Sequence, residues 1–463
     1  MLIHPDDTVD IHLDDGQKYA ARDIRCGEPV IKYGFPIGEA IKDIQKGDKI
    51  GPHNLRSLLD GICEWRYEEG NISFPLDTKE GYFTGYLRPD GRAGIRNELW
   101  IVPTVGCING VARQLAHLTG AKALTHPYGC SQLGADLETT RKTLAALIRH
   151  PNAGGVLVLG LGCENNLIDG LMQAVDNYGG TYDKSRIRYL EIQKCGDEIE
   201  EGLEILSALR AIIDADIPTK LPLNLLKIGV KCGGSDGYSG ITANPLIGQV
   251  AEEFALHGAS ILMTEIPEVF GAEEELLSRA SNRRVFDEGV AVINGFRRYY
   301  LSHGEKISEN PSPGNIAGGI TTLEEKSLGC VQKGGRVPLM GVCGMGEYAT
   351  APGLTLVDGP GNDMVAVTNL MTAGANLILF STGRGTPLSA PVPTLKISTN
   401  SLLAQQKPHW IDFDAGRLLD GSTLPECRTS LFSLCLDILN GTPTKGESNG
   451  YYDIAIFKTG VTL

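Results

Sequence analysis

The sequence predicts an α/β protein in which a small β unit precedes two closely packed α/β domains with mainly parallel sheets. Three short apolar runs end in Gly-Cys, at Cys107, Cys130 and Cys163, and helix-like segments at 109–118 and 136–150 separate them. Parallel strands require such crossovers. Because ligands of these sheets gather outside the carboxyl ends of the strands, we expect the three thiols to face one common site.

Length and composition exclude several classes of protein. The chain of 463 residues exceeds what one core supports, so two or three domains are expected. A net charge of −14 argues against nucleic acid or an anionic membrane surface as a partner, and no apolar run approaches the ~20 residues of a membrane span. The acidic start lacks a secretory signal, and eleven cysteines suit a reducing compartment, so we expect a cytoplasmic protein.

Changes in composition and hydrophobic pattern along the chain divide it into four parts. Residues 1–60 carry short strands between regularly spaced glycines, which predicts a compact β unit. Residues 61–85 are polar and aperiodic and are expected to form a linker. Residues 86–300 alternate strand-like and helix-like runs, as in a doubly wound domain. A long glycine-rich loop then opens a third domain, 301–463.

The motifs of several enzyme classes are missing. The chain has no P-loop, no dinucleotide-binding G-x-G-x-x-G after the first strand, and no G-x-S-x-G. Instead, metal-ligating side chains follow the predicted strands: Cys107, His126, Cys130, Cys163, Glu164, Cys232, Asp236, Glu265 and Glu268. A single free cysteine is often a buried hydrophobic residue, but three at strand ends favour a site. The mixed donor set favours Fe(II), with an iron–sulfur cluster held by three cysteines as the minority alternative.

A metal beside arginines suggests lyase chemistry on a hydroxy acid. The metal would bind the carboxylate and α-hydroxyl, a base would take the α-proton, and an acid would assist loss of the β-hydroxyl. Candidates for proton transfer are His126, Glu265, His303 and Lys333, and Arg384 is the candidate for a bidentate grip on a carboxylate. The other candidate substrate-binding residues lie in basic or glycine-rich segments: Arg92, Arg96, Ser235, Asp236, Asn315 and Thr382.

Long strings of the sequence also resemble the altronate/galactarate dehydratase family. The resemblance covers about 85–463, and the matching segments are 91–101, 103–107, 128–134, 150–154, 160–166, 232–237, 239–245, 267–268, 270–273, 310–315, 381–387 and 455–463. It implies dehydration of D-altronate to 2-keto-3-deoxy-D-gluconate, with Fe(II) as cofactor and Mn(II) as a substitute. Residues 30–38 resemble a β-clip domain of the SAF type, which ends in His53-Asn54.

Two positions depart from the family pattern in this N-terminal part. Gln17 stands where the family has a histidine, and Gly51-Pro52 leaves His53 as the single histidine before Asn54. His53 is a surface turn residue or a metal ligand, and we carry it as a candidate ligand with Cys107, Cys130, Cys163 and Glu164. If the missing histidines bind metal in relatives, this chain holds its metal differently or acts on another substrate.

Three hypotheses follow. The first is a metal-dependent sugar-acid dehydratase, with altronate as substrate. The second is a related lyase acting on galactarate or, as in the sulfolactate-cleaving branch, on another hydroxy acid. The third is a sugar-acid sensor that binds without turnover. The partner is in each case a small sugar acid, and a homo-oligomer is left open.

Overall fold

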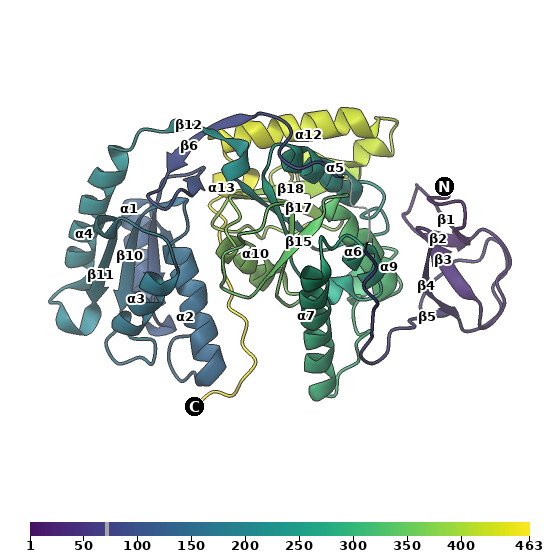
Figure 1. Ribbon diagram of the computed structural model, residues 1–463, viewed down its shortest axis with the longest axis horizontal. Helices are drawn as coiled ribbons and strands as arrows, with labels where there is room; N and C mark the ends of the chain where they lie inside the picture. Colours follow the sequence, from purple (N-terminus) through teal and green to yellow (C-terminus); the bar gives the residue numbers. More distant parts are fainter. Residues whose placement is uncertain (70–73) are drawn as a thin grey trace.

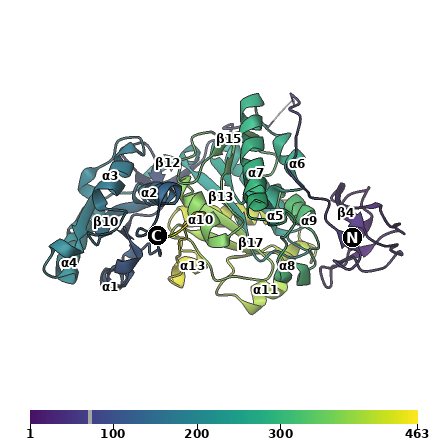
Figure 2. The ribbon, with the colours of Figure 1, turned by 90° about the horizontal axis from the view of Figure 1, so that it is seen from below.

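The computed structural model describes residues 1–69 and 74–463 and confirms the α/β class (Figure 1). Three units stand side by side. A β module at the N-terminus lies at one end, a unit with a seven-stranded sheet lies in the middle, and a unit with a four-stranded sheet lies at the other end. The view from below gives the same order (Figure 2). The β module and the four-stranded sheet therefore flank opposite sides of the middle unit.

The β module is a pair of small antiparallel sheets, as the spaced glycines predict. Its strands are β1 (Val9–Ile11) and β2 (Lys18–Ala20) in one sheet, and β3 (Pro29–Lys32), β4 (Phe35–Ala40) and β5 (Leu55–Arg56) in the other. Alternate residues such as Val9, Val30 and Ile37 are buried between them.

The expected linker is more ordered than its polar sequence suggests. Residues 70–73 lie outside the described part of the chain. Before them, the carbonyl of Cys63 accepts a hydrogen bond from the Asn294 side chain, and the ring of Trp65 lies against the guanidinium of Arg297. This part of the expected linker therefore packs along α7 (Arg283–Ser302). Beyond residues 70–73, β6 (Tyr82–Leu87) pairs with β12 (Thr219–Pro222) and β7 (Ala93–Gly94). Packing against an existing surface supplied order that composition alone could not predict.

The four-stranded sheet is fully parallel, in the order β11-β10-β8-β9, and helices cover both of its faces. One apolar core lies on the face of α1 and α4, and a second on the face of α2 and α3. The elements are β8 (Glu98–Pro103), α1 (Asn109–Thr119), β9 (Lys122–Ala123), α2 (Gly134–Ile148), β10 (Ala153–Gly160), α3 (Ile168–Asn177), β11 (Ile187–Glu191) and α4 (Glu198–Asp214).

The seven-stranded sheet is also parallel, in the order β15-β16-β14-β13-β17-β18-β19. Its strands are β13 (Lys227–Cys232), β14 (Ser260–Met263), β15 (Leu339–Cys343), β16 (Leu354–Val357), β17 (Leu377–Thr382), β18 (Thr394–Ser398) and β19 (Phe413–Asp414). Its longer helices are α5 (Ala243–Leu256), α7, α9 (Leu323–Cys330), α10 (Asp363–Thr372) and α12 (Leu424–Leu439), and its short ones are α6 (Glu273–Leu277), α8 (Pro313–Ala317), α11 (Ser401–Gln406) and α13 (Lys445–Ser448).

This topology corrects the expected boundary at residue 300. Strands β13 and β14 precede that boundary, yet they pair with β17 and β16 in the seven-stranded sheet. Both strands are buried on both faces, and their sequence does not indicate which of two parallel sheets they join. The strand order reverses between β13 and β17, because β14 lies on one side of β13 and β17 on the other. Ligands of open α/β sheets bind at such a switch point.

Candidate functional site

The site begins at the switch point, where the turns after β13 and β17 are bonded to each other. Gly233 donates its amide to the carbonyl of Ser381 at 3.0 Å, and Gly383 and Arg384 donate theirs to Gly234 at 3.1 and 2.9 Å. Gly234 has a φ of +61°, which a glycine adopts without strain. The two glycine-rich turns thus hold Cys232 and Arg384 at the same edge of the sheet.

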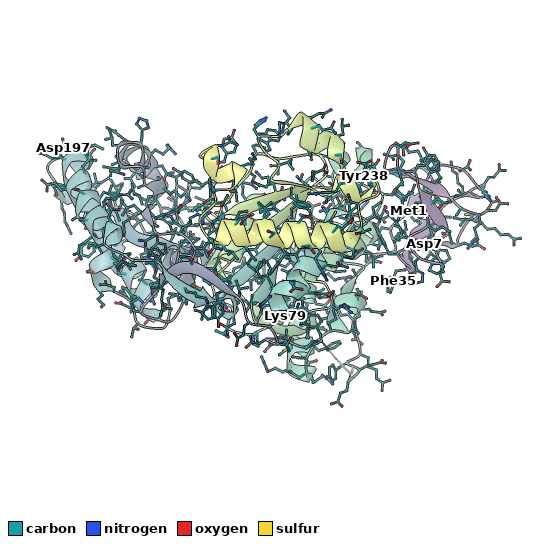
Figure 3. All side chains as sticks on the ribbon, turned by 90° about the horizontal axis from the view of Figure 1, so that it is seen from above. Met1, Asp7, Phe35, Lys79, Asp197 and Tyr238 are labelled. Atoms are coloured by element: carbon teal, nitrogen blue, oxygen red, sulfur yellow. The ribbon has the colours of Figure 1, made fainter. Side chains whose placement is uncertain are left out.

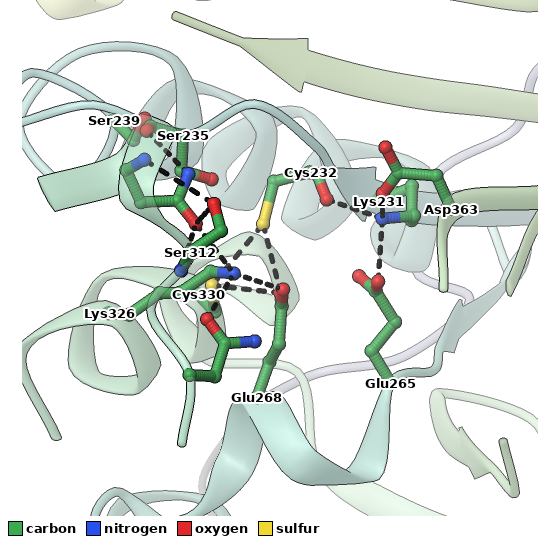
Figure 4. Close-up of polar contacts among 12 residues, drawn as sticks. Lys231, Cys232, Ser235, Ser239, Glu265, Glu268, Ser312, Lys326, Cys330 and Asp363 are labelled. Atoms are coloured by element: carbon green, nitrogen blue, oxygen red, sulfur yellow. Dashed lines mark hydrogen bonds and ion pairs between the residues drawn. The ribbon is translucent and has the colours of Figure 1, made fainter. Parts of the chain in front are cut away.

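Beneath these turns, Cys232, Glu268 and Cys330 form a buried group that we call the Cys–Glu group (Figure 4). The two sulfurs are 3.2 Å apart, and the Glu268 carboxylate lies 3.4 Å from Cys232 Sγ and 3.2 Å from Cys330 Sγ. The three ligand atoms all lie within 4.8 Å of one another, which makes this a candidate metal site. Among the described residues no other trio of histidine, cysteine and carboxylate side chains meets that distance.

Lysines surround the Cys–Glu group and balance its charge. Lys333 Nζ donates to Cys232 Sγ at 2.8 Å, and Lys326 Nζ lies 2.8 Å from Glu268. The hydrogen bond with Cys330 lowers the pKa of Cys232 to about 6, with the charge of Lys333 acting in the same direction against burial. Burial opposes the charge of Glu268, but Lys326 and the neighbouring lysines hold its pKa well below the ordinary value.

A buried ion pair between Lys231 and Glu265 stands next to the Cys–Glu group. Lys231 Nζ lies 2.7 Å from both Glu265 and Asp363. Burial, followed by the charge of Glu268, raises the pKa of Glu265 well above its ordinary value. Glu265 has a φ of +69°, a left-handed backbone that costs a non-glycine residue about 1–3 kcal/mol and that is typical of functional sites.

The β module closes the other side of the site. Glu325 on α9 accepts from Lys18 at 2.8 Å and from Lys32 at 2.7 Å, and all three side chains are buried. The backbones meet so closely that a Cβ on Gly237 would lie 1.9 Å from the carbonyl oxygen of Gly16. Tyr238, the neighbour of Gly237, marks this junction in Figure 3.

A cavity of about 10 Å³ remains between the β module, α9 and the turn after β13. Ser235 lines it, and its buried hydroxyl has no hydrogen-bond partner in the described part of the chain. Buried polar atoms are normally satisfied, so this hydroxyl is a candidate contact for a ligand. Arg384 does not line this cavity; it is exposed, in the turn that is bonded to Gly234.

Three of the predicted substrate-binding residues shape the site through bonds within the protein. Asn315 caps α8 with Ser312 and donates to the carbonyl of Ser235 at 2.8 Å. Asp236 accepts from the hydroxyl of Thr399 at 2.8 Å, and the hydroxyl of Thr382 accepts from the amide of Gly385 at 3.0 Å. These residues position the turns.

Several other candidates lie away from the site. His126 is buried in the four-stranded unit, where burial lowers its pKa to about 4 and Pro103 binds its ring, and His303 is exposed at the end of α7. Arg92 pairs with Asp90 and Arg96 with Glu447.

The candidate metal ligands are also dispersed. His53 lies exposed in a turn of the β module. Cys107, Cys130 and Cys163 are exposed at the carboxyl edge of the four-stranded sheet, in a different unit from Arg384. Glu164 accepts from the amides of Leu161 and Gly162 and thereby caps its own turn. The sulfur-bearing turns and the arginine loop therefore do not surround one cavity, because β8–β10 and β17 belong to separate sheets.

Sequence reasoning missed five charged residues and one cysteine that the fold collects around the site. They come from four separate segments, and only their later burial distinguishes them from surface charges: Lys18, Lys32, Lys231, Glu325, Lys326 and Cys330. Cys330 could have been noticed because Lys333 follows it one helical turn later.

Fold and site together define an α/β enzyme with a buried group of cysteine, glutamate and lysine side chains at a topological switch point. The chain belongs to the altronate/galactarate dehydratase family. Three family descriptions match it: the altronate/galactarate dehydratase SAF domain over residues 4–58, the second domain of D-galactarate dehydratase/altronate hydrolase over 85–214, and the C-terminal part of D-galactarate/altronate dehydratase over 223–462. The protein is therefore a hydro-lyase of the sugar-acid dehydratase type, and its N-terminal module is a SAF domain.

Curated relatives agree with this assignment. The chain is 45% identical to the altronate dehydratases of Escherichia coli (strain K12) and Bacillus subtilis (strain 168), each over 97% of this chain and 92% of the relative. It is 30% identical to galactarate dehydratase (L-threo-forming) of Escherichia coli (strain K12), over 93% of this chain and 86% of the relative. No helix in the described part of the chain is both long enough and apolar enough to cross a membrane.

Proposed function

We propose that the protein dehydrates D-altronate to 2-keto-3-deoxy-D-gluconate. The observation that carries the proposal is the buried Cys–Glu group with its lysines, which stands at the switch point beside the unpartnered hydroxyl of Ser235. The 45% identity to two altronate dehydratases supports altronate over galactarate, whose dehydratase is 30% identical.

We propose Cys232, Glu268 and Cys330 as the residues that hold the metal. Two sulfurs and one carboxylate suit Fe(II) better than Mn(II), because Mn(II) prefers oxygen ligands. Lys326 and Lys333 balance the anionic charge of the donors, and would have to move aside from them for an ion to bind. When bound, the ion would act as a Lewis acid on the carboxylate and α-hydroxyl of the substrate.

Two of the four candidate proton-transfer residues remain in the proposal, Glu265 and Lys333. The raised pKa of Glu265 makes its carboxylate a stronger base than usual, suited to taking the α-proton. Burial lowers the pKa of Lys333, but the charge of Cys232 more than compensates, so its Nζ keeps a proton that it can give to the leaving β-hydroxyl. Arg384, exposed in the turn after β17, would bind the substrate carboxylate.

The test is an anaerobic assay of purified protein with Fe(II) under reducing conditions. D-Altronate should yield a 2-keto-3-deoxy acid, while galactarate and sulfolactate serve as competing substrates in the same panel. Binding of altronate without product would favour the sensor, and product from another acid alone would reassign the substrate. The cytoplasmic location and a homo-oligomer stay predictions, which fractionation and sedimentation of the native protein would check.

A further inference from the structure

Three of the four exposed cysteines of the described chain lie at one edge of the four-stranded sheet. Of the protein's eleven cysteines, all of them in the described part of the chain, four are exposed: Cys26, Cys107, Cys130 and Cys163. The last three follow β8, β9 and β10, which are neighbours in the four-stranded sheet. Packing explains a buried cysteine, but it does not explain three exposed thiols at the carboxyl edge of one sheet.

Backbone contacts hold the three sulfur-bearing turns side by side. Gly106 donates its amide to the carbonyl of Tyr128 at 2.8 Å, which joins the turns of Cys107 and Cys130. Asn166 donates to the carbonyl of Gly129 at 2.9 Å, which joins the turns of Cys130 and Cys163. We call this set of turns the three-cysteine edge.

The glycines before Cys130 and Cys163 lie too close to neighbouring atoms for a side chain. Gly129 has a φ of +100°, and a Cβ on it would lie 2.0 Å from the carbonyl oxygen of Thr104. Gly162 has a φ of +121°, and its Cβ would lie 2.8 Å from the side chains of Glu191 and Gln193. Gly129 therefore allows the turns of Cys107 and Cys130 to meet, and Gly162 allows the turn of Cys163 to lie against Glu191 and Gln193.

The thiols have few partners within the protein. In the described structure Cys107 Sγ has no hydrogen bond, Cys130 Sγ contacts only the Ser131 hydroxyl at 3.9 Å, and Cys163 Sγ accepts from the Gln193 amide at 3.5 Å. They do not come within 4.8 Å of one another as a trio, so no single-ion site is preformed. A cluster is larger than one ion, and its cysteine ligands stand further apart.

We propose that Cys107, Cys130 and Cys163 bind a [4Fe–4S] cluster, in a site separate from the Cys–Glu group. Each thiol would lose its proton and bind one iron as a thiolate. The fourth iron would have no cysteine ligand and would face solvent, where it could accept an oxygen ligand such as a hydroxyl or carboxylate. The proposal uses no residue of the dehydratase site.

The experiment is anaerobic reconstitution of the full-length protein with equal amounts of ferrous and ferric iron and with sulfide, which together supply the two ferrous and two ferric ions of a [4Fe–4S] cluster in its 2+ state. After removal of unbound metal, the protein should hold about four irons and about four acid-labile sulfides per chain and show the brown absorption of a cluster. The variant with Cys107→Ser, Cys130→Ser and Cys163→Ser should lose the sulfide and the colour. Cys26→Ser, which changes the remaining exposed cysteine, should keep both.

Other outcomes overturn the proposal. Iron without sulfide would show that single ions bind, and a cluster that survives in the triple variant would place it elsewhere. A cluster lost in Cys232→Ser but kept in the triple variant would assign it to the Cys–Glu group. Since the readouts are iron, sulfide and absorption, a failure to turn over altronate leaves this result unaffected.

Discussion

The hydroxyl of Ser235 forms no hydrogen bond within the described protein and is available to a bound substrate. It is buried and has no partner in the described structure, so Ser235→Ala removes no hydrogen bond from the folded state. We expect an unchanged or raised melting temperature, because a buried unsatisfied group is costly. If substrate satisfies the hydroxyl, kcat/KM should fall roughly two- to tenfold.

Ser389→Ala is the matched control for this change. Its hydroxyl is likewise buried and unsatisfied, but it faces α13 rather than the cavity. Thermal unfolding and steady-state kinetics of both variants give the answer. Equal kinetics for Ser235→Ala and the parent protein would remove Ser235 from the substrate site.

Arg384 gives a second prediction at the residue scale. A guanidinium–carboxylate contact contributes about 1.5–3 kcal/mol, so Arg384→Ala should raise KM for altronate roughly ten- to hundredfold. Arg283→Ala, an exposed arginine on α7, should leave KM unchanged. Isothermal titration with substrate separates binding from turnover, and an unaltered affinity would exclude Arg384 from carboxylate recognition.

His126 should act through stability and not through catalysis. Its folded-state pKa of about 4 lies below the ordinary 6.5, so its contribution to stability is present above pH 6.5 and is lost as the pH falls toward 4. Over that window the loss amounts to about 3 kcal/mol. Urea titrations at several pH values should therefore show that the cost of His126→Asn shrinks on acidification. A cost independent of pH would mean that His126 titrates normally.

At the scale of elements, the contact between α9 and the β module depends on one carboxylate. Lys18 and Lys32 lower the pKa of Glu325 to about 2 against the effect of burial, so its contribution to stability is lost as the pH falls from 4.5 toward 2. Glu325→Gln leaves two buried ammonium groups without a counter-charge and should cost about 3–5 kcal/mol.

The readout for Glu325→Gln is limited proteolysis combined with thermal unfolding. The variant should release the β module at lower protease concentration than the parent. Glu39→Gln, which breaks the exposed pair with Arg56, should cost under about 1 kcal/mol. If both variants behave alike, the Lys18–Glu325–Lys32 contact does not hold the module in place.

Individual strands and helices were predicted from the sequence more reliably than the sheets in which the strands pair. Periodicity and Gly-Cys ends located the strands at 98–103 and 153–160 and the helices between them, because each pattern is local. The same local patterns could not assign β13 and β14 to a sheet, since both strands are buried on both faces. The site shows the same limit: Lys18 and Glu325 are over 300 residues apart, and only the docked β module joins them.

At the scale of the whole molecule, the site is too closed for its substrate. The cavity of about 10 Å³ has room for about one water, whereas pockets for small molecules hold roughly 300–1,000 Å³. Under the proposed function, substrate binding at this cavity would therefore move an element that lines it, and the β module contributes Lys32 and Tyr33 to the lining.

Hydrogen exchange with and without altronate tests this opening. We expect altered amide protection in β3 and in the segment 312–320, and unchanged protection in α4 at the far end of the molecule. Identical exchange at saturating substrate, in protein that is turning over, would mean that the substrate enters by another route.

The contact between Gly16 and Gly237 limits how the parts of this protein can be exchanged. A single added methyl group at Gly237 would collide with a backbone oxygen of the SAF domain. We therefore expect that this domain cannot be replaced freely by the SAF domain of a relative. A hybrid that takes its first 60 residues from a relative would need the backbone around Gly16 and the backbone around Gly237 to keep their present conformations where they meet. Recombination between family members should therefore succeed at the β6 junction of the other unit sooner than at this one.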